Sequence, residues 1–186
     1  MARKQQVRRQ SAGKKTAAKQ PAKRQSGKQM RDAGPAPGTK APAFSLPRDN
    51  GGTVSLADFA GRKLVLYFYP RADTSGCTKE AIDFSRLRGD FARAATEIVG
   101  VSADPVPALA KFKAKHKLAI ALASDETHRM LGAYGVWQEK SLYGRKFLGV
   151  VRTTFLIGPD GRIAKVWPKV SVDGHAADVL AAAKAF

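Results

Sequence analysis

Cysteine is almost missing from this chain, because its 186 residues include only Cys77. A single cysteine excludes a disulfide within the chain and any metal site built from cysteines alone. It leaves an inert buried thiol, a reactive thiol, or a thiol that pairs between two molecules. Such sparing use of cysteine is typical of a reducing compartment, and we therefore expect a cytoplasmic protein.

Long apolar segments are also missing. No apolar run approaches the roughly 20 residues that a transmembrane helix needs, so we expect no membrane-spanning segment. A secretory signal is excluded as well, because no apolar core follows the basic residues at the start of the chain. The hydrophobic share of 44% is ordinary for a globular domain.

Acidic residues are missing from the first 31 positions, which hold eleven Lys or Arg and no Asp or Glu. This part of the chain has no aromatic residue, and Val7 is its only branched aliphatic one. It cannot bury enough apolar surface to offset the entropy lost on ordering. We therefore predict a disordered basic tail and linker over residues 1–36, with "AGPAPGTKAP" at residues 33–42 as a stiff connection, and one domain over residues 37–186.

The basic tail leaves two interpretations open. Its charge favours weak, non-specific binding to nucleic acid through residues 1–31, which would place the protein near a nucleoid or a nucleus. Without aromatic residues to stack on bases, the tail is not expected to recognise a base sequence. The alternative is a tail that only keeps the protein soluble, since charged runs are commonly just solvated.

The rest of the chain alternates between strand patterns and helix patterns. Buried strands are predicted where short apolar runs end at turn residues, and helices where apolar residues recur every three or four positions. The predicted strands cover residues 64–69, 97–102, 118–125, 151–157 and 162–167, and the predicted helices cover residues 76–95, 107–117, 125–135 and 173–186. A small hairpin turned by "DNGG", residues 49–52, precedes them.

This order of elements predicts an α/β protein with a thioredoxin-like fold. Alternation followed by a hairpin around "GPDG" gives a mixed central sheet flanked by helices, with the first hairpin as an N-terminal extension. In open α/β sheets, ligands bind beyond the carboxyl ends of the strands. Cys77 follows such an end.

The stretch "YFYPRADTSGCTKEA" places Cys77 between a strand and the first turn of a helix. That turn carries unsatisfied N–H groups and about half a positive charge, so it favours a thiolate over a thiol. Gly76 lets the backbone approach a small ligand, and Asp73 or Thr74 is a candidate helix cap. Position alone is compatible with either a nucleophilic sulfur or an inert buried cysteine.

The same stretch resembles the active-site segment of the peroxiredoxins, and most of all that of the peroxiredoxin Q branch, also called the bacterioferritin comigratory proteins. The family pattern of Pro, three residues, Thr or Ser, two residues and Cys falls on Pro70, Thr74 and Cys77. The similarity continues through "FSLPRDNGGTVSLADF", "GVSAD" and "YGVWQEKSLYGRKFLGVVRTTFLIGPDGRI", and covers about residues 38–186.

The resemblance implies a peroxidase that reduces hydrogen peroxide and organic hydroperoxides without a metal or another cofactor. It makes Cys77 the peroxidatic nucleophile, which peroxide converts to a sulfenic acid. Thr74 would hydrogen-bond the peroxide, and Pro70 would shield the sulfur from water. Both residues belong to the quoted motif.

Three further residues take their roles from the resemblance. Arg152 would favour the thiolate and stabilise the charge that develops along the breaking O–O bond. Glu80 would orient this arginine. Backbone N–H groups near Gly76 and Cys77 would complete the substrate pocket.

The chain departs from the family at two positions. Many relatives carry a second cysteine five residues after the first, and here Ile82 stands in that place. The sulfenic acid must therefore be reduced by an external thiol, for which thioredoxin, glutaredoxin and glutathione are candidates. Ser75 replaces the usual proline before Gly76, which affects the expected rate more than the type of reaction.

Two functions of different classes follow. The first is a monomeric antioxidant enzyme, a thiol-dependent peroxidase. The second is a nucleic-acid-associated binding protein that carries the basic tail on a thioredoxin-like scaffold. A disulfide oxidoreductase is excluded because the chain has no Cys-x-x-Cys pair. His116, His128 and His175 are scattered over predicted helices as solvated or capping residues, and we assign them no metal or proton-transfer role.

Overall fold

The computed structural model describes residues 34–142 and 144–186, besides Met1. Nearly all of the predicted disordered tail therefore lies outside the described residues. The second half of the predicted linker is bonded to the turn between the last two strands. The N–H of Gly38 donates to the carbonyl of Ile163 at 2.8 Å, and the N–H of Ala41 donates to the carbonyl of Gly161 at 2.9 Å. Residues 38–41 are thus part of the folded domain.

A five-stranded mixed sheet forms the centre of the domain, in the order β5-β4-β3-β8-β9. Its strands are β3 (Lys63–Phe68), β4 (Thr96–Ser102), β5 (Ala121–Ser124), β8 (Thr153–Ile157) and β9 (Ile163–Trp167). β3, β4 and β5 are parallel, whereas β8 is antiparallel to both β3 and β9. The predicted thioredoxin-like α/β fold with a mixed sheet is confirmed, and each strand overlaps its predicted range.

In the described part of the chain, four α-helices accompany the sheet, namely α1 (Ser75–Arg93), α2 (Val106–His116), α3 (Arg129–Ala133) and α4 (His175–Ala185). Three of them match their predicted ranges. The prediction of a helix over residues 125–135 was wrong in its first turn, because His128 has a φ of 58° and interrupts the helical path. Asp125 still provides a hydrogen-bond acceptor for one backbone N–H in the first turn of this helix, since its Oδ2 accepts the N–H of Leu131 at 2.9 Å.

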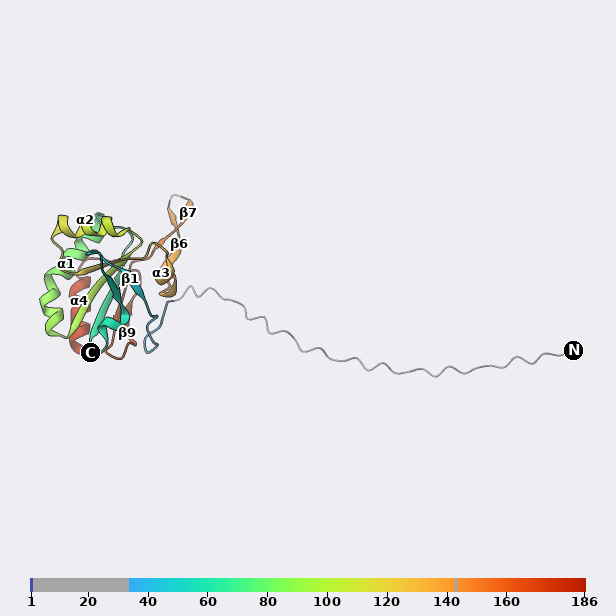
Figure 1. The fold of residues 1–186 in the computed structure, drawn as a ribbon, viewed down its shortest axis with the longest axis horizontal. Helices are drawn as coiled ribbons and strands as arrows, with labels where there is room; N and C mark the ends of the chain where they lie inside the picture. Colours follow the sequence, from blue (N-terminus) through green and yellow to red (C-terminus); the bar gives the residue numbers. More distant parts are fainter. Residues whose placement is uncertain (2–33, 143) are drawn as a thin grey trace. The chain divides into compact units, whose positions relative to one another are not determined.

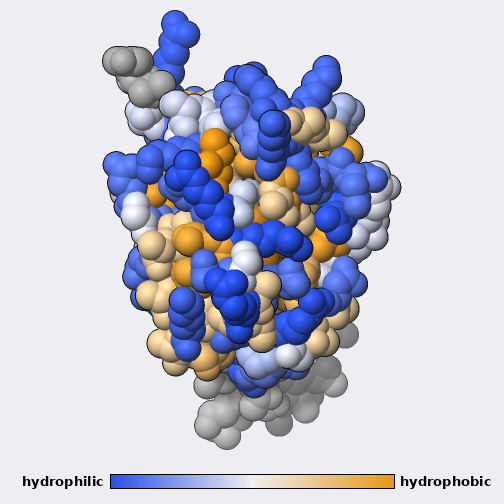
Figure 2. Space-filling model, turned by 90° about the vertical axis from the view of Figure 1, so that its left-hand side faces the viewer, coloured by the Kyte–Doolittle hydropathy of each residue, from blue (hydrophilic) through white to orange (hydrophobic). Residues whose placement is uncertain are grey.

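The central strand β3 is buried on both faces, which explains its unbroken apolar sequence. Side chains of alternate residues enter two separate apolar clusters, so that Leu66 and Phe68 face one side and Val65 and Tyr67 the other. α1, α2 and α4 cover the side of Tyr67, and α3 covers the opposite side (Figure 1). Hydrophilic side chains predominate on the outer surface of the three larger helices, with apolar ones between them (Figure 2).

The predicted N-terminal hairpin is confirmed as β1 (Ser45–Pro47) and β2 (Thr53–Ser55), followed by the short 3₁₀ helix η1 (Leu56–Phe59). Gly51 in its turn has a φ of 82°, a conformation that glycine adopts without strain. Among the described residues, no helix is long and apolar enough to cross a membrane.

A further hairpin, besides the two that were predicted, was not expected from the sequence. It consists of β6 (Trp137–Leu142) and β7 (Arg145–Val150), and it projects from the edge of the domain beside α3 (Figure 1). Phe147 and Leu148 on β7 are 47% and 60% exposed, so this hairpin lacks the buried face that makes a strand recognisable in a sequence. Its base is joined to the domain where the N–H of Val151 donates to the carbonyl of Val136 at 2.8 Å.

Candidate active site

The candidate site begins where β3 ends and α1 starts. Thr74 is the residue before the helix and has an extended backbone, and its carbonyl accepts the N–H of Thr78 at 2.8 Å. Neither Thr74 nor Asp73 caps the helix through its side chain. Instead, Asp73 has a φ of 60° and its carboxylate lies 2.6 Å from Lys115 Nζ and 2.7 Å from His116 Nε2. Thr74 is therefore the N-cap residue of α1, as one of the two candidates, but no hydrogen bond from its side chain caps the helix.

The loop before α1 is fixed from two directions. The hydrogen bonds from His116 and Lys115 lower the pKa of Asp73 and join the loop to the end of α2. On the other side, Asp104 Oδ2 accepts the N–H of Ala72 at 2.7 Å and the hydroxyl of Ser102 at 2.8 Å. The loop is thereby tied to the carboxyl end of β4, which keeps the start of α1 in place.

Cys77 lies in the first turn of α1 and is 2% exposed. Its sulfur accepts a hydrogen bond from Arg152 Nη2 at 3.2 Å. Glu80 lies on the same face of the helix three residues later, is 1% exposed, and accepts a hydrogen bond from Arg152 Nη1 through its Oε2. One guanidinium group, with 15% of the Arg152 side chain exposed, therefore bridges the thiol and the carboxylate.

Strand pairing explains why Arg152 reaches this point. β8 runs antiparallel to β3, and its first residue, Thr153, pairs with Phe68 at the carboxyl end of β3. Arg152 directly precedes β8, so it lies at the same edge of the sheet as the start of α1. The carbonyl of Arg152 accepts the N–H of Val170 at 3.0 Å, which holds its backbone.

The environment of Glu80 is unusual for a carboxylate. Burial raises its pKa to about 7, although the charge and hydrogen bond of Arg152 act in the opposite direction. Its second oxygen, Oε1, has no hydrogen-bond partner among the described residues. The carboxylate is therefore held by one side chain only, and that side chain is shared with the sulfur.

Buried aromatic rings belong to the same apolar cluster as Cys77. Tyr67 on β3 is fully buried, and its ring stacks on Phe84 of α1 with 4.8 Å between the centroids. Burial raises the pKa of Tyr67 well above its ordinary value, so the phenol remains neutral. A side chain at Gly100 would place its Cβ 2.5 Å from the hydroxyl oxygen of Tyr67, so the glycine makes room for this ring.

The structure brings some, but not all, of the predicted site residues together around the sulfur of Cys77. Gly76, Cys77, Glu80 and Arg152 come together, and a Cβ on Gly76 would lie 3.5 Å from Arg152 Nη2. The hydroxyl of Thr74 instead donates within its own loop, to the carbonyl of Arg71 at 3.1 Å. Both Thr74 and Pro70 are exposed.

The prediction that the histidines are solvated or capping was wrong for His175. This residue opens α4 but is 6% exposed, and its Nε2 lies 2.8 Å from the hydroxyl of Thr154. Its ring packs edge-on against Phe84 and Trp167. Burial lowers the pKa of His175 to about 4, so it remains neutral near pH 7.

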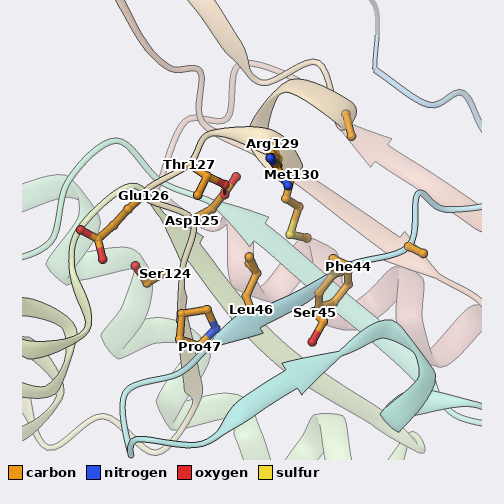
Figure 3. A pocket seen from close by; sticks show the side chains of 12 residues that line it. Phe44, Ser45, Leu46, Pro47, Ser124, Asp125, Glu126, Thr127, Arg129 and Met130 are labelled. Carbon is orange, nitrogen blue, oxygen red and sulfur yellow. Dashed lines mark hydrogen bonds between the residues drawn. The ribbon is translucent and has the colours of Figure 1, made fainter.

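A cavity lies elsewhere, between β1 and the loop that follows β5 (Figure 3). It has a volume of about 480 Å³, and neither Cys77 nor Arg152 lines it. Two buried polar residues line it, and both are hydrogen-bonded. The two oxygens of Asp125 accept the Thr127 hydroxyl and the Leu131 N–H, and the Ser124 hydroxyl donates to the carbonyl of Asp104. The site at Cys77 is therefore separate from this cavity.

Comparisons with known proteins show the family of this chain. The AhpC/TSA family matches residues 37–166. Peroxiredoxin Bcp of Bacillus subtilis is 44% identical over 143 residues, which are 77% of this chain and 91% of that protein. Peroxiredoxin Bcp of Escherichia coli is 38% identical over 138 residues, which are 74% of this chain and 88% of that protein.

Solved structures give the same result. Peroxiredoxin Q of Xanthomonas campestris has a TM-score of 0.74 and 43% identity, over 76% of this chain and 90% of that one. Structures of the bacterioferritin comigratory protein of the same organism, 42% identical with a TM-score of 0.74 over 76% of this chain and 90% of that one, concern its alkyl peroxide reduction activity. The chain belongs to the AhpC/TSA family and, within it, is a peroxiredoxin of the Q or Bcp type, a thiol-dependent peroxidase.

Proposed function

We propose that Cys77 is the peroxidatic residue and that it acts as a thiolate. Its sulfur attacks one oxygen of the peroxide, so that an S–O bond forms and the O–O bond breaks. The sulfur is oxidised by two electrons to a sulfenic acid. The departing oxygen takes up a proton and leaves as water, or as an alcohol when the substrate is an organic hydroperoxide.

The observation that carries this proposal is the position of Arg152. Its guanidinium donates to the sulfur of Cys77 at 3.2 Å while Glu80 holds its other nitrogen. A fixed positive charge at this distance stabilises a thiolate, and it also stabilises the negative charge that develops on the departing oxygen. Glu80 keeps the planar guanidinium in the orientation that both tasks require.

The remaining site residues complete the proposal. Backbone N–H groups in the first turn of α1, at Gly76 and Cys77, would bind the peroxide oxygen because such groups lack partners inside the helix. Thr74 would turn its hydroxyl from the Arg71 carbonyl to the peroxide. Pro70 would limit the access of water to the sulfur.

The sulfenic acid would be reduced by a thiol from outside the chain. Ile82 occupies the position five residues after Cys77, and the chain has no second cysteine. An external thiol would attack the sulfenic sulfur and release water, leaving a mixed disulfide, and a second thiol would then restore Cys77. Thioredoxin, glutaredoxin and glutathione are the candidate reductants.

The test replaces the sulfur with oxygen. Cys77→Ser should abolish rapid peroxide consumption in stopped-flow measurements with hydrogen peroxide and with an organic hydroperoxide. The alkyl peroxide reduction of the X. campestris protein supports the second substrate class. Peroxide consumption that is unchanged in Cys77→Ser would end the proposal.

Further properties of the whole protein are also proposals. We propose a cytoplasmic monomer, whose basic residues 1–31 bind nucleic acid weakly and could place the enzyme near a nucleoid. The composition of that segment supports the binding, because it holds eleven basic and no acidic residues. A mobility-shift assay at low salt should distinguish the intact chain from one that lacks residues 1–31, and equal mobility shifts would contradict the binding.

A further inference from the structure

The loop between β9 and α4, residues 168–174, contacts the candidate site at the start of α1. Within this loop, the N–H of Val170 donates to the carbonyl of Arg152 at 3.0 Å. A Cβ at Gly76 would lie 3.5 Å from Arg152 Nη2 and 4.0 Å from Val172 Cγ2. The side chain of Val172 and the nitrogen that bonds the sulfur therefore approach the same point.

Val172 is held in this position from both sides. The bond of Val170 to the backbone of Arg152 lies before it. After it, Asp173 Oδ1 lies 2.9 Å from Lys79 Nζ on α1, so the charges next to Val172 are paired with each other. Val172 itself is half-buried, which leaves part of an apolar side chain accessible beside the site.

The inner sides of the site are already occupied. Buried Glu80 accepts the hydrogen bond from one nitrogen of the guanidinium. Cys77 belongs to the same apolar cluster as Tyr67, which is fully buried. A substrate with a group larger than hydrogen must therefore place that group on the outer side, where Gly76 and Val172 are partly exposed.

The chemistry also determines where the organic group of a hydroperoxide lies. The thiolate attacks the oxygen that carries hydrogen and keeps it as a sulfenic acid. The O–O bond breaks, and the oxygen bonded to carbon departs, takes up a proton and leaves as an alcohol. In the proposed mechanism Arg152 stabilises the charge on this departing oxygen. The carbon substituent is thus next to the guanidinium, on the side where Val172 lies.

We propose that Val172 is a specificity-determining residue, whose side chain contacts the apolar group of an organic hydroperoxide during the attack by Cys77. This proposal rests on the proposed function, because it assumes that Cys77 and Arg152 act on the peroxide. An apolar contact that persists in the transition state raises the rate only for substrates that make it. Hydrogen peroxide has no such group, so the contact favours organic hydroperoxides.

The test compares two peroxides on the same variants. Val172→Thr keeps the branched shape of the side chain and replaces one methyl group with a hydroxyl group. The second-order rate constant for oxidation of Cys77, measured by stopped flow, should fall about fivefold with cumene hydroperoxide. With hydrogen peroxide it should remain within about twofold, which also shows that the variant is folded.

Two further variants serve as controls. Val172→Ile keeps this position apolar and should preserve the ratio of the two rate constants within about twofold. Ser171 is exposed on the same loop, so Ser171→Ala should leave both rate constants unchanged.

The proposal is overturned if Val172→Thr slows both peroxides equally, as a purely structural role would require, or if it slows neither. It is also overturned if Val172→Ile loses the preference for cumene hydroperoxide as Val172→Thr does. These outcomes concern the ratio of two rate constants. They are separate from a failure of the proposed function, which is measured by the consumption of hydrogen peroxide in Cys77→Ser.

Discussion

Two buried carboxylates, Glu80 and Asp49, make a useful comparison, because both side chains are at most 2% exposed and both pair with cations. Asp49 follows β1 and contacts Lys113 of α2 and, at 3.6 Å, Arg48. It also joins its hairpin to β5, since its Oδ1 accepts the N–H of Leu122 at 3.2 Å and its own N–H donates to the Leu122 carbonyl at 3.0 Å.

The two carboxylates differ in how completely they are satisfied. Both oxygens of Asp49 have partners, and its two cations are about 30% exposed, so part of their charge remains in water. Glu80 uses one oxygen only, and its cation also binds the sulfur of Cys77. A carboxylate that serves the fold is fully bonded, whereas one that serves a reaction shares its partner with the reacting atom.

The largest expected effect comes from removing the shared cation. Arg152→Met should slow the oxidation of Cys77 by peroxide about 10²- to 10³-fold, because it removes the group that stabilises the developing charge. Lys113→Met removes the corresponding cation of Asp49 and should leave this rate within about twofold. Single-turnover stopped-flow measurements distinguish the two, and an equal loss in both variants would show that the cations act only through the fold.

The next effect is on stability. Asp49→Ala should lower the free energy of unfolding by about 3 kcal/mol, because it leaves the N–H of Leu122 and the cation of Lys113 without their partner. Glu80→Gln should change it by about 1 kcal/mol or less at pH 7, since a buried, half-satisfied carboxylate stabilises little. Urea denaturation followed by circular dichroism measures both, and a larger loss for Glu80→Gln would contradict the comparison.

The smallest expected effect is on the way the free energy of unfolding depends on pH. Burial raises the pKa of Glu80 to about 7 from 4.5 and lowers that of His175 to about 4 from 6.5. Between pH 4.5 and about 7, the native state therefore binds more protons at Glu80 than the unfolded state does. Between about pH 4 and 6.5, it binds fewer protons at His175. The stability that Glu80 contributes is lost as pH rises toward 7, and the contribution of His175 is lost as pH falls from 6.5 toward 4.

Two variants separate these opposing contributions. Relative to the wild type, the free energy of unfolding should rise with pH in Glu80→Gln and fall with pH in His175→Gln, in each case by about 1 kcal/mol per pH unit. Urea denaturation across the range from pH 4.5 to 6.5 measures both slopes. Parallel curves for the three proteins would contradict the assigned burial of these groups.

The parts of the structure that could be predicted from sequence are those with a strong local pattern. β3 was recognisable from its unbroken apolar run, and α1 from apolar residues at helical spacing such as Phe84 and Phe91. Cys77 was marked by its position between them. Arg152 came only from the family resemblance, because its proximity depends on the pairing of β8 with β3 across more than 80 residues of chain.

The missed features depend on tertiary structure. The β6–β7 hairpin has little buried surface, so its sequence lacks regular alternation. Lys140 is an ordinary lysine until the hairpin brings it to the Val150 carbonyl. His175 follows a glycine at a helix start, which is typical of an exposed cap, and it is buried only because α4 packs against α1. Asp104 lies in the recognised "GVSAD", but its role depends on the loop that it holds.

The most direct test of the account is whether the sulfur of Cys77 takes up one oxygen from peroxide. The protein would be treated with one equivalent of hydrogen peroxide, trapped with dimedone and measured by intact mass spectrometry. We predict a single dimedone adduct on the wild type, which an added thiol prevents, and no adduct on Cys77→Ser. A wild-type protein that keeps its free thiol after peroxide, with no adduct, would contradict the account.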